Sequence, residues 1–410
     1  MKTFGLALLL TFLLWMPHDA AAQRESPKGV SAGTLPGPSP VLVWKFKTDA
    51  PIISSPIVNA GTVFFGGLDS SVYAVDLHAG VLKWELQTGG EIRSTPLVWN
   101  GIVYVTCGDG LLRAIDENTG SLKWTFATEG ERKYDFADYY QSSPVIDRDR
   151  VYFGSGDGFL YAVRTLDGTL IWKYRTGDVV HATPALDSSR VYVGSFDGYF
   201  YAVDRVSGEL AWRFKSVGHY YFPKGEFQGS PSVSGSLVYV GARDFNFYAI
   251  DRERGFCHWN KAFPRGWALA NVIEDTTLYI GTSDDRLLIA ARPSSGREYW
   301  KTNLNFNIFG KLAVADSVGY IGTLLGKVYG IDLRSGAIMW TFATDGYEQN
   351  HLKYFKPDDS FRDDIFEIVK SDEAFIAVEY EMGALFSTPV FTHDRLLVTS
   401  ADGTIYCLRR

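Results

Sequence analysis

The sequence has 410 residues, of which 15% are aromatic and 41 are glycine, and its formal net charge is −7. A high content of aromatic residues and glycines favours a sheet-rich protein with many tight turns over a helical one. The mildly acidic balance, without a long basic run, argues against nucleic acid as a partner.

The first 22 residues have the pattern of a cleaved signal peptide. Lys2 is followed by an apolar run of 12 residues from Phe4 to Trp15, and three alanines end at Ala22. The run is short for a bilayer-spanning helix, although an N-terminal membrane anchor is the alternative interpretation. The first cysteine is Cys107, so none near the cleavage site could carry a lipid. We therefore predict export to the periplasm or the cell exterior, with no integral membrane span.

A Pro-, Gly- and Ser-rich stretch at 23–40 is predicted to be a disordered linker, and a sequence repeat fills residues 41–410. Each copy begins with Ser/Thr-Pro or a variant of it, continues with V-Y-x-G-like and Y-A-x-D-like runs, passes a Gly turn and ends on Trp. The copies span 54–84, 94–124, 142–172, 182–212, 229–259, 269–300 and 310–340. Four β-rich runs separated by tight turns in about forty residues predict one four-stranded antiparallel propeller blade per copy.

An eighth copy begins at Ser387 and stops at Leu408 without its tryptophan. The missing last strand matches Val41 to Phe46 at the other end of the chain. Joining these segments would close a ring and remove its open edge, whereas an open solenoid of eight units would need capping repeats. The sequence therefore predicts an all-β, single eight-bladed β-propeller of four-stranded antiparallel blades, with the last blade closed by an N-terminal strand. One closed chain suffices, so a monomer is expected.

One tryptophan recurs at a fixed place in each blade, and we expect each to pack on the neighbouring blade as a structural residue. The eight are Trp44, Trp84, Trp124, Trp172, Trp212, Trp259, Trp300 and Trp340. The three cysteines, Cys107, Cys257 and Cys407, fall in different repeats, and we expect them to be small buried hydrophobes. Without a CxxC motif or a Cys/His cluster, no metal site is predicted.

The pattern A-x-D-x-x-x-G-x-x-x-W occurs at 74–84, 114–124 and 202–212, with similar copies at 249–259 and 330–340. It resembles the tryptophan-docking repeat of the pyrroloquinoline-quinone (PQQ) propeller superfamily, over residues 41–410. The resemblance implies one of two functions. Quinoprotein dehydrogenases bind PQQ and usually Ca²⁺ in the central funnel, whereas a non-catalytic branch is typified by the periplasmic propeller lipoprotein of the outer-membrane β-barrel assembly machine.

In length and blade count the chain looks like the non-catalytic branch, although it has no lipid-acceptor cysteine. Two features that the resemblance would imply for a dehydrogenase are missing. No two cysteines are adjacent, and no Glu/Asn/Asp set for a metal and a base lies at the starts of the inner strands. No nucleophile–base pair stands out, so no catalytic residue is predicted.

Three long links between blades are expected to rise from one face of the propeller, because all follow the fourth strand of a blade. We call 129–141 the first insert, 216–228 the second and 345–386 the third. Their clustered aromatic residues are typical of a partner-binding face, or alternatively of a rim that packs on itself. These residues are Tyr134, Phe136, Tyr139, Tyr140, Tyr220, Tyr221, Phe222, Tyr347, Tyr354 and Phe355. Within the third insert, residues 358–370 have apolar residues at helical spacing and predict a short amphipathic helix.

Aligning the repeats places a set of polar side chains at the funnel mouth. The candidates for holding an anionic or polar ligand are Arg93, Gln141, His181, Gln228 and Lys311. The first hypothesis is a non-catalytic scaffold that binds protein, peptide or glycan partners in the cell envelope and needs no cofactor. The alternative is a PQQ/Ca-dependent quinoprotein oxidoreductase that uses the funnel.

Overall fold

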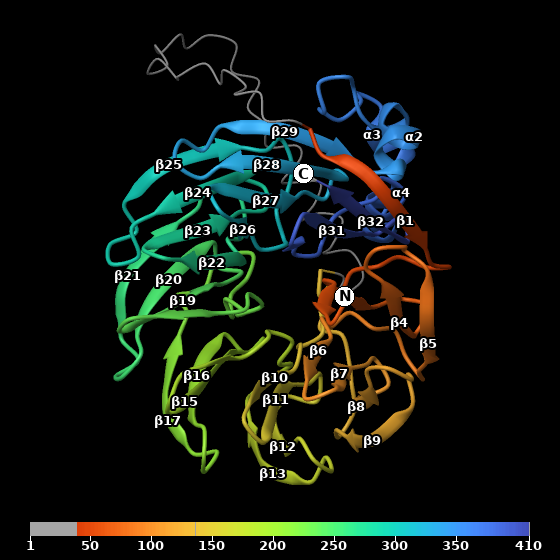
Figure 1. The fold of residues 1–410 in the computed structure, drawn as a ribbon. Helices are drawn as coiled ribbons and strands as arrows, with labels where there is room; N and C mark the ends of the chain where they lie inside the picture. Colours follow the sequence, from red (N-terminus) through yellow and green to blue (C-terminus); the bar gives the residue numbers. More distant parts are fainter. Residues whose placement is uncertain (1–38, 136, 410) are drawn as a thin grey trace.

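The computed structural model describes residues 39–135 and 137–409, and within these residues eight four-stranded antiparallel sheets surround an axis (Figure 1). The predicted signal peptide and most of the predicted linker lie outside the described residues. Blade 1 comprises β2 (Ile57–Asn59), β3 (Thr62–Gly66), β4 (Ser71–Asp76) and β5 (Leu82–Gln87). Blade 2 comprises β6 (Leu97–Trp99), β7 (Ile102–Thr106), β8 (Leu111–Asp116) and β9 (Leu122–Ala127). Blade 3 comprises β10 (Val145–Asp147), β11 (Arg150–Gly154), β12 (Phe159–Arg164) and β13 (Leu170–Arg175).

The next four blades repeat this arrangement, with the first strand of each nearest the axis. Blade 4 comprises β14 (Ala185–Leu186), β15 (Arg190–Gly194), β16 (Tyr199–Asp204) and β17 (Leu210–Lys215). Blade 5 comprises β18 (Ser232–Ser234), β19 (Leu237–Gly241), β20 (Asn246–Asp251) and β21 (Cys257–Ala262). Blade 6 comprises β22 (Ala270–Glu274), β23 (Thr277–Gly281), β24 (Leu287–Ala291) and β25 (Glu298–Asn303). Blade 7 comprises β26 (Ala313–Ala315), β27 (Val318–Gly322), β28 (Lys327–Asp332) and β29 (Ile338–Ala343).

The eighth blade joins the two ends of the described chain. Its order is β30 (Val390–Thr392), β31 (Arg395–Ser400), β32 (Thr404–Arg409) and then β1 (Val41–Lys47). β1 runs antiparallel to β32, and Trp44 lies opposite Cys407 in the register. The predicted eight-bladed propeller, closed by an N-terminal strand, is therefore confirmed.

The repeated Asp, Gly and Trp residues explain how one blade holds the next. In blade 1, the Asp76 carboxylate accepts backbone N–H groups of the turn before β5, and Gly80 in that turn has φ +68°. A Cβ at Gly80 would lie 2.5 Å from the Trp44 ring, so glycine makes room for the indole of the preceding blade. The Trp44 indole then donates to Leu77 O at 2.9 Å. Trp84, Trp124, Trp172, Trp212, Trp259 and Trp300 donate in the same way to the following blade.

Apolar side chains from adjacent blades form the core between them. Buried tyrosines, valines and phenylalanines of the two middle strands interdigitate with the neighbouring blade. Cys107 and Cys407 are buried as expected, whereas Cys257 is only partly buried, because it lies in the outer strand β21. No helix among the described residues is long and apolar enough to cross a bilayer.

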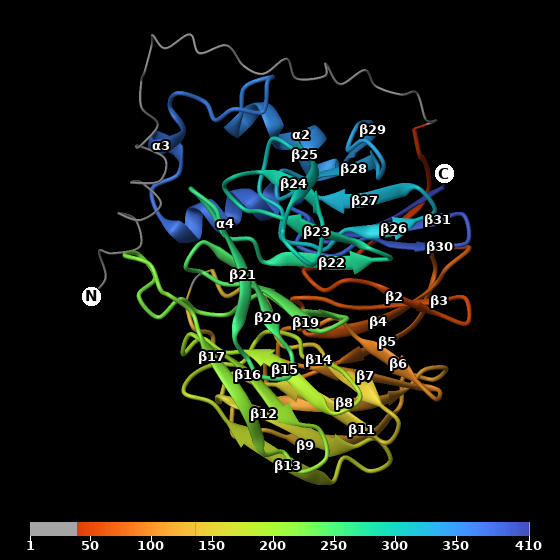
Figure 2. The same cartoon turned by 90° about the vertical axis from the view of Figure 1, so that its left-hand side faces the viewer.

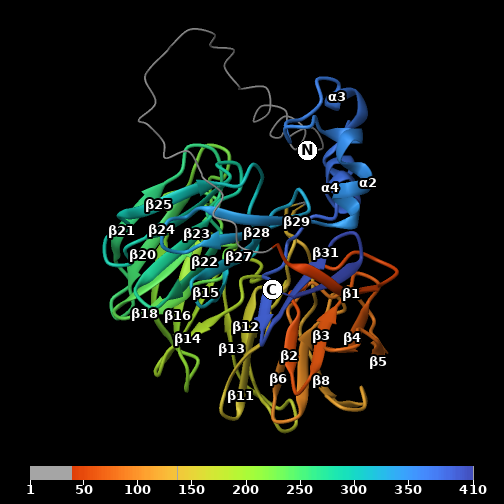
Figure 3. The same ribbon diagram turned by 45° about the horizontal axis from the view of Figure 1, so that its top comes forward.

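The helices of the described residues belong to the third insert and rise from one face of the ring beside β29 and β31 (Figures 2 and 3). They are α2 (Asp345–Tyr354), α3 (Ile365–Ile368) and α4 (Asp372–Glu381). The prediction of an amphipathic helix over 358–370 is therefore wrong, because only the single turn α3 in this range is helical. Asp359 has φ +65°, and its carboxylate binds Lys327 and Tyr347, which holds this part of the insert in a turn.

Candidate functional site

The three inserts meet at the mouth of the funnel. The first and third inserts contribute Tyr139, Tyr354, Phe355 and Phe386 to one buried apolar cluster, which also contains Phe309 from the blades. The second insert joins them through Tyr134, whose hydroxyl donates to Glu226 at 3.1 Å. The funnel mouth is thus covered by chain that does not belong to the repeat.

Tyr139 is the centre of an apolar plug across the axis. Its ring lies 5.5 Å from that of Phe309, just before blade 7, and 4.8 Å from that of Phe386, at the end of the third insert. Ile53 of blade 1 belongs to the same cluster, so residues from opposite sides of the ring meet here. All four side chains are at least nine-tenths buried. We refer to Ile53, Tyr139, Phe309 and Phe386 as the plug.

His181, one of the predicted ligand-binding residues, instead binds the first insert. Its Nδ1 lies 2.8 Å from Asp138 and its Nε2 lies 2.6 Å from Glu131. Burial alone would lower the pKa of His181, but the Asp138 and Glu131 carboxylates raise it to about 9. The imidazole is therefore charged at neutral pH and holds the first insert on blade 4.

We expect the His181 imidazole to titrate near pH 9 in a proton–nitrogen NMR titration of the folded protein. Because this pKa lies above the ordinary value of about 6.5, the charged ring contributes its full stabilisation below pH about 6.5. That contribution is lost as the pH rises through 9. A midpoint close to the ordinary value would show that the ring is not held between two carboxylates.

Gln228 and Arg243 form a second anchor for the first insert. Gln228 donates to Ala137 O at 2.8 Å and accepts from the Arg243 Nε at 2.9 Å. Arg243 is completely buried, and its guanidinium forms two hydrogen bonds with Asp135, at 2.5 and 3.1 Å. Its guanidinium carbon also lies 4.9 Å from the centroid of the Trp267 ring. The anchor fixes the insert to blade 5.

The remaining predicted residues, Arg93, Gln141 and Lys311, divide into two groups. Arg93 N–H donates to the Gln141 side chain at 3.0 Å, and the Arg93 guanidinium binds Glu91 and Tyr139 O. Lys311 stands apart, because no ion pair or side-chain hydrogen bond joins its ammonium group to another of the described residues. Arg93, His181 and Gln228 thus bind the first insert, to which Gln141 itself belongs, whereas Lys311 does not.

These contacts bear on whether the funnel mouth suits a quinone cofactor. The donors of Arg93, His181 and Gln228 are bound to the chain itself, and the plug occupies the axis. As arranged, the residues do not fit a planar anionic quinone at this level. Among the described residues, no group of three or more His, Cys, Asp or Glu side chains is placed to hold a metal ion.

Sequence reasoning missed Arg243, Asp135, Asp138 and Glu131. Arg243 lies directly before the Asp of the turn between the second and third strands, where blades 2 and 3 have Gly108 and Gly156. Comparing this position across the repeats would have identified Arg243 as exceptional. The three acidic partners lie in the first insert, which has no counterpart in the other blades to be compared with.

The predicted aromatic face is only partly open. Tyr139, Tyr354 and Phe355 are buried, and Tyr134, Tyr140, Phe222 and Tyr347 are partly buried. Tyr220 is 87% exposed and Tyr221 is 38% exposed, while Phe136 lies outside the described residues. Leu352 of α2 adds a side chain that is 64% exposed on this face. Most of the aromatic residues therefore build the face, and a few project from it.

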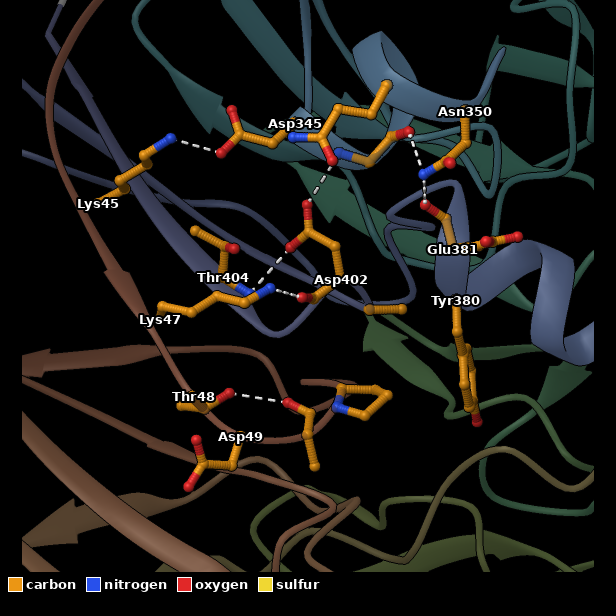
Figure 4. A pocket seen from close by; sticks show the side chains of 15 residues that line it. Lys45, Lys47, Thr48, Asp49, Asp345, Asn350, Tyr380, Glu381, Asp402 and Thr404 are labelled. Carbon is orange, nitrogen blue, oxygen red and sulfur yellow. Dashed lines mark hydrogen bonds and ion pairs between the residues drawn. The ribbon is translucent and has the colours of Figure 1, made fainter. Parts of the chain in front are cut away.

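A polar pocket of about 630 Å³ lies where the third insert meets the ring-closing strand β1 (Figure 4). Lys45 on β1 pairs with Asp345 at the start of α2, at 2.5 Å. Lys47 donates to Asp402 O, and the Asp402 carboxylate accepts from Gly346 N–H at 3.2 Å. The charges that line the pocket are thus largely paired with one another, and they tie α2 to the seam of the ring.

Comparison with known proteins relates this chain to one protein family and to several solved structures. A family model described as outer membrane protein assembly factor BamB matches residues 39–261 and 259–374. BamB from Moraxella catarrhalis is 16% identical, with a TM-score of 0.67 over 90% of this chain and 100% of that chain. No curated protein matches this chain.

Two other solved structures share the fold. The computationally designed Ika8 protein is 15% identical, with a TM-score of 0.69 over 91% of this chain and 100% of that chain. Quinohemoprotein alcohol dehydrogenase from Comamonas testosteroni is 13% identical, with a TM-score of 0.67 over 94% of this chain and 78% of that chain. At these identities the likeness shows the fold alone.

Proposed function

Because this chain belongs to the family of the outer membrane protein assembly factor BamB, we propose that it is a non-catalytic scaffold that binds a protein partner in the cell envelope. The observation that supports this function best is the closure of the funnel mouth by the first insert. In the alternative, a quinoprotein oxidoreductase, the same residues would have to face a cofactor. In the scaffold that we propose, the inserts serve as a binding platform and not as the rim of an active site.

The charge of the third insert indicates the kind of partner. This insert has eleven Asp and Glu residues against four Lys and Arg residues, so its formal net charge of −7 equals that of the whole chain. The rest of the chain is balanced. An acidic platform with projecting apolar side chains such as Tyr220 and Leu352 suits a partner surface that is basic and partly apolar.

We expect paired charge substitutions on this face to abolish function without unfolding the protein. In a host that lacks the chromosomal copy, Tyr220→Arg with Leu352→Arg should fail to restore the amount of outer-membrane β-barrel proteins in the envelope. Both side chains are more than half exposed, so folding should be unaffected. Quantitative mass spectrometry of the outer membrane would measure the restoration, and immunoblots would check the level of the variant.

The matched control is Leu166→Arg with Val206→Arg, whose side chains are 80% and 65% exposed. They lie in the turns before β13 and β17, on the opposite face of the ring. The control pair should restore the outer-membrane proteins fully. Full restoration by the insert-face pair would contradict the proposed face, and saturable uptake of PQQ with Ca²⁺, with dye reduction by alcohols or sugars, would favour the quinoprotein alternative.

A further inference from the structure

A ring of hydroxyl groups links the innermost strands of neighbouring blades around the axis. At the position just before the repeat proline, the backbone N–H of one blade donates to the hydroxyl of the next. The bonds run from Ser55 to Thr95 (3.3 Å), Thr95 to Ser143 (2.9 Å), Ser143 to Thr183 (3.1 Å), Thr183 to Ser230 (3.1 Å), Lys311 to Thr388 (3.0 Å) and Thr388 to Ser55 (2.9 Å).

None of these hydroxyls donates a hydrogen bond to an acceptor in the part of the chain that the structure describes. Each oxygen accepts a backbone N–H and keeps its own O–H to donate. All six residues are partly exposed, although they lie in or beside the innermost strands of their blades. Since a propeller encloses a central channel, this exposure is to the channel. The ring therefore presents hydroxyl donors to the channel.

Blades 6 and 7 break the ring. Blade 6 has Ala270 at this position, which offers no hydroxyl, and blade 7 has Lys311. Lys311 thus occupies a position of the ring with an ammonium-bearing side chain, and its backbone N–H donates to the Thr388 hydroxyl. Two residues before it lies Phe309 of the plug, so the ring and Lys311 lie directly below the apolar closure of the funnel mouth.

Lys311 has no counter-charge on the described residues. None of the ion pairs within 39–135 and 137–409 includes it, and its side chain is only partly exposed. Burial lowers the pKa of Lys311 to about 8, and no neighbouring charge contributes to the shift. A cation held in a confined position without a carboxylate partner is costly unless an anion accompanies it.

We propose that Lys311 and the hydroxyl ring bind a small oxyanion in the central channel. The ammonium supplies the charge, and the nearest ring hydroxyls, including Thr388, donate hydrogen bonds to the anion oxygens. This site is independent of the insert face and of its partner.

The test uses inorganic sulfate, whose charge is constant between pH 6 and pH 9, with acetate as a second probe. Isothermal titration calorimetry of the full chain should show one saturable site for at least one of them. Lys311→Met should weaken that binding by at least about tenfold, because a charged hydrogen-bond donor is lost. The same anion should protect Lys311 from acetylation, measured by peptide mass spectrometry. Lys301→Met, on the outer strand β25, is the matched control and should bind normally.

The dependence on pH separates this site from adventitious binding. Binding to the wild type should weaken as the pH rises through about 8, since the amine loses its charge. Lys311→Arg should bind across the whole range without this loss, because a guanidinium stays protonated. Absence of binding by both anions, equal binding by Lys311→Met, or unprotected acetylation of Lys311 would overturn the proposal.

Discussion

Replacing Trp172 by alanine is expected to lower the free energy of unfolding by about 3–5 kcal/mol. Trp172 is 8% exposed and packs between two blades, with its indole ring 5.8 Å from Tyr152. The indole donates to Arg205 O at 3.2 Å, and the ring covers Gly208, which has φ +76°. The substitution removes a hydrogen bond and opens a cavity that the rigid turn around Gly208 cannot fill. Urea-induced unfolding followed by circular dichroism would measure the change.

Trp99→Ala provides the matched control for this experiment. Trp99 is 41% exposed at the end of β6, and it is not one of the residues that dock one blade on the next. Its replacement should change the free energy of unfolding by no more than about 0.5–1 kcal/mol. If both variants unfold at the same urea concentration as the wild type, the docking tryptophans do not hold the ring together.

The ring itself could be predicted from the sequence because each blade is a local unit that recurs. Asp76 caps the turn before β5, and Gly80 in that turn leaves room for the indole ring of the preceding blade. Trp84 packs in the same way against the glycine of the next blade. The position of the seam followed from a missing strand at one end and an extra strand at the other. Physical rules that act within about forty residues were sufficient here.

The helices were harder to predict, because their signals are caps and not an apolar stripe. The Ser371 hydroxyl accepts from Ala374 N–H at 3.1 Å at the start of α4, and Gly383 follows its end with φ +70°. This pair of start and stop signals was present in the sequence. The apolar spacing of Phe361 and Ile365 was misleading. Both side chains pack against the apolar cluster of the funnel mouth, but Phe361 does so from a turn and Ile365 from the single helical turn α3.

The repeat alignment placed the polar funnel residues at equivalent positions of their blades, but it could not predict their partners. A repeat alignment compares a position with its counterparts in other blades. His181 and Gln228 bind Asp138 and Ala137 O, which lie in a segment that occurs once in the chain. A contact between a repeating position and a segment that occurs once produces no periodic pattern in the sequence. The repeat alignment therefore suggested a ligand at a place that the first insert occupies in the structure.

Removing the charge of Asp135 tests whether the first insert depends on its buried anchor. Asp135→Asn is expected to lower the free energy of unfolding by about 3–5 kcal/mol, because it leaves the Arg243 guanidinium buried without a counter-charge. Arg243 is 0% exposed, so water cannot replace the carboxylate. The asparagine oxygen can still accept the Ala137 N–H that Asp135 accepts at 3.0 Å, so the local turn is preserved.

The reverse substitution separates loss of charge from loss of contact. The Asp135 side chain is 32% exposed, so Arg243→Met leaves a carboxylate that water can reach and should cost only about 1–3 kcal/mol. Asp135→Asn combined with Arg243→Met should be clearly more stable than the sum of the two losses, because no unpaired charge remains in the interior. Urea-induced unfolding of all four proteins gives the coupling energy. A coupling close to zero would mean that the guanidinium is satisfied by Gln228 and the rings of Phe196 and Trp267 alone.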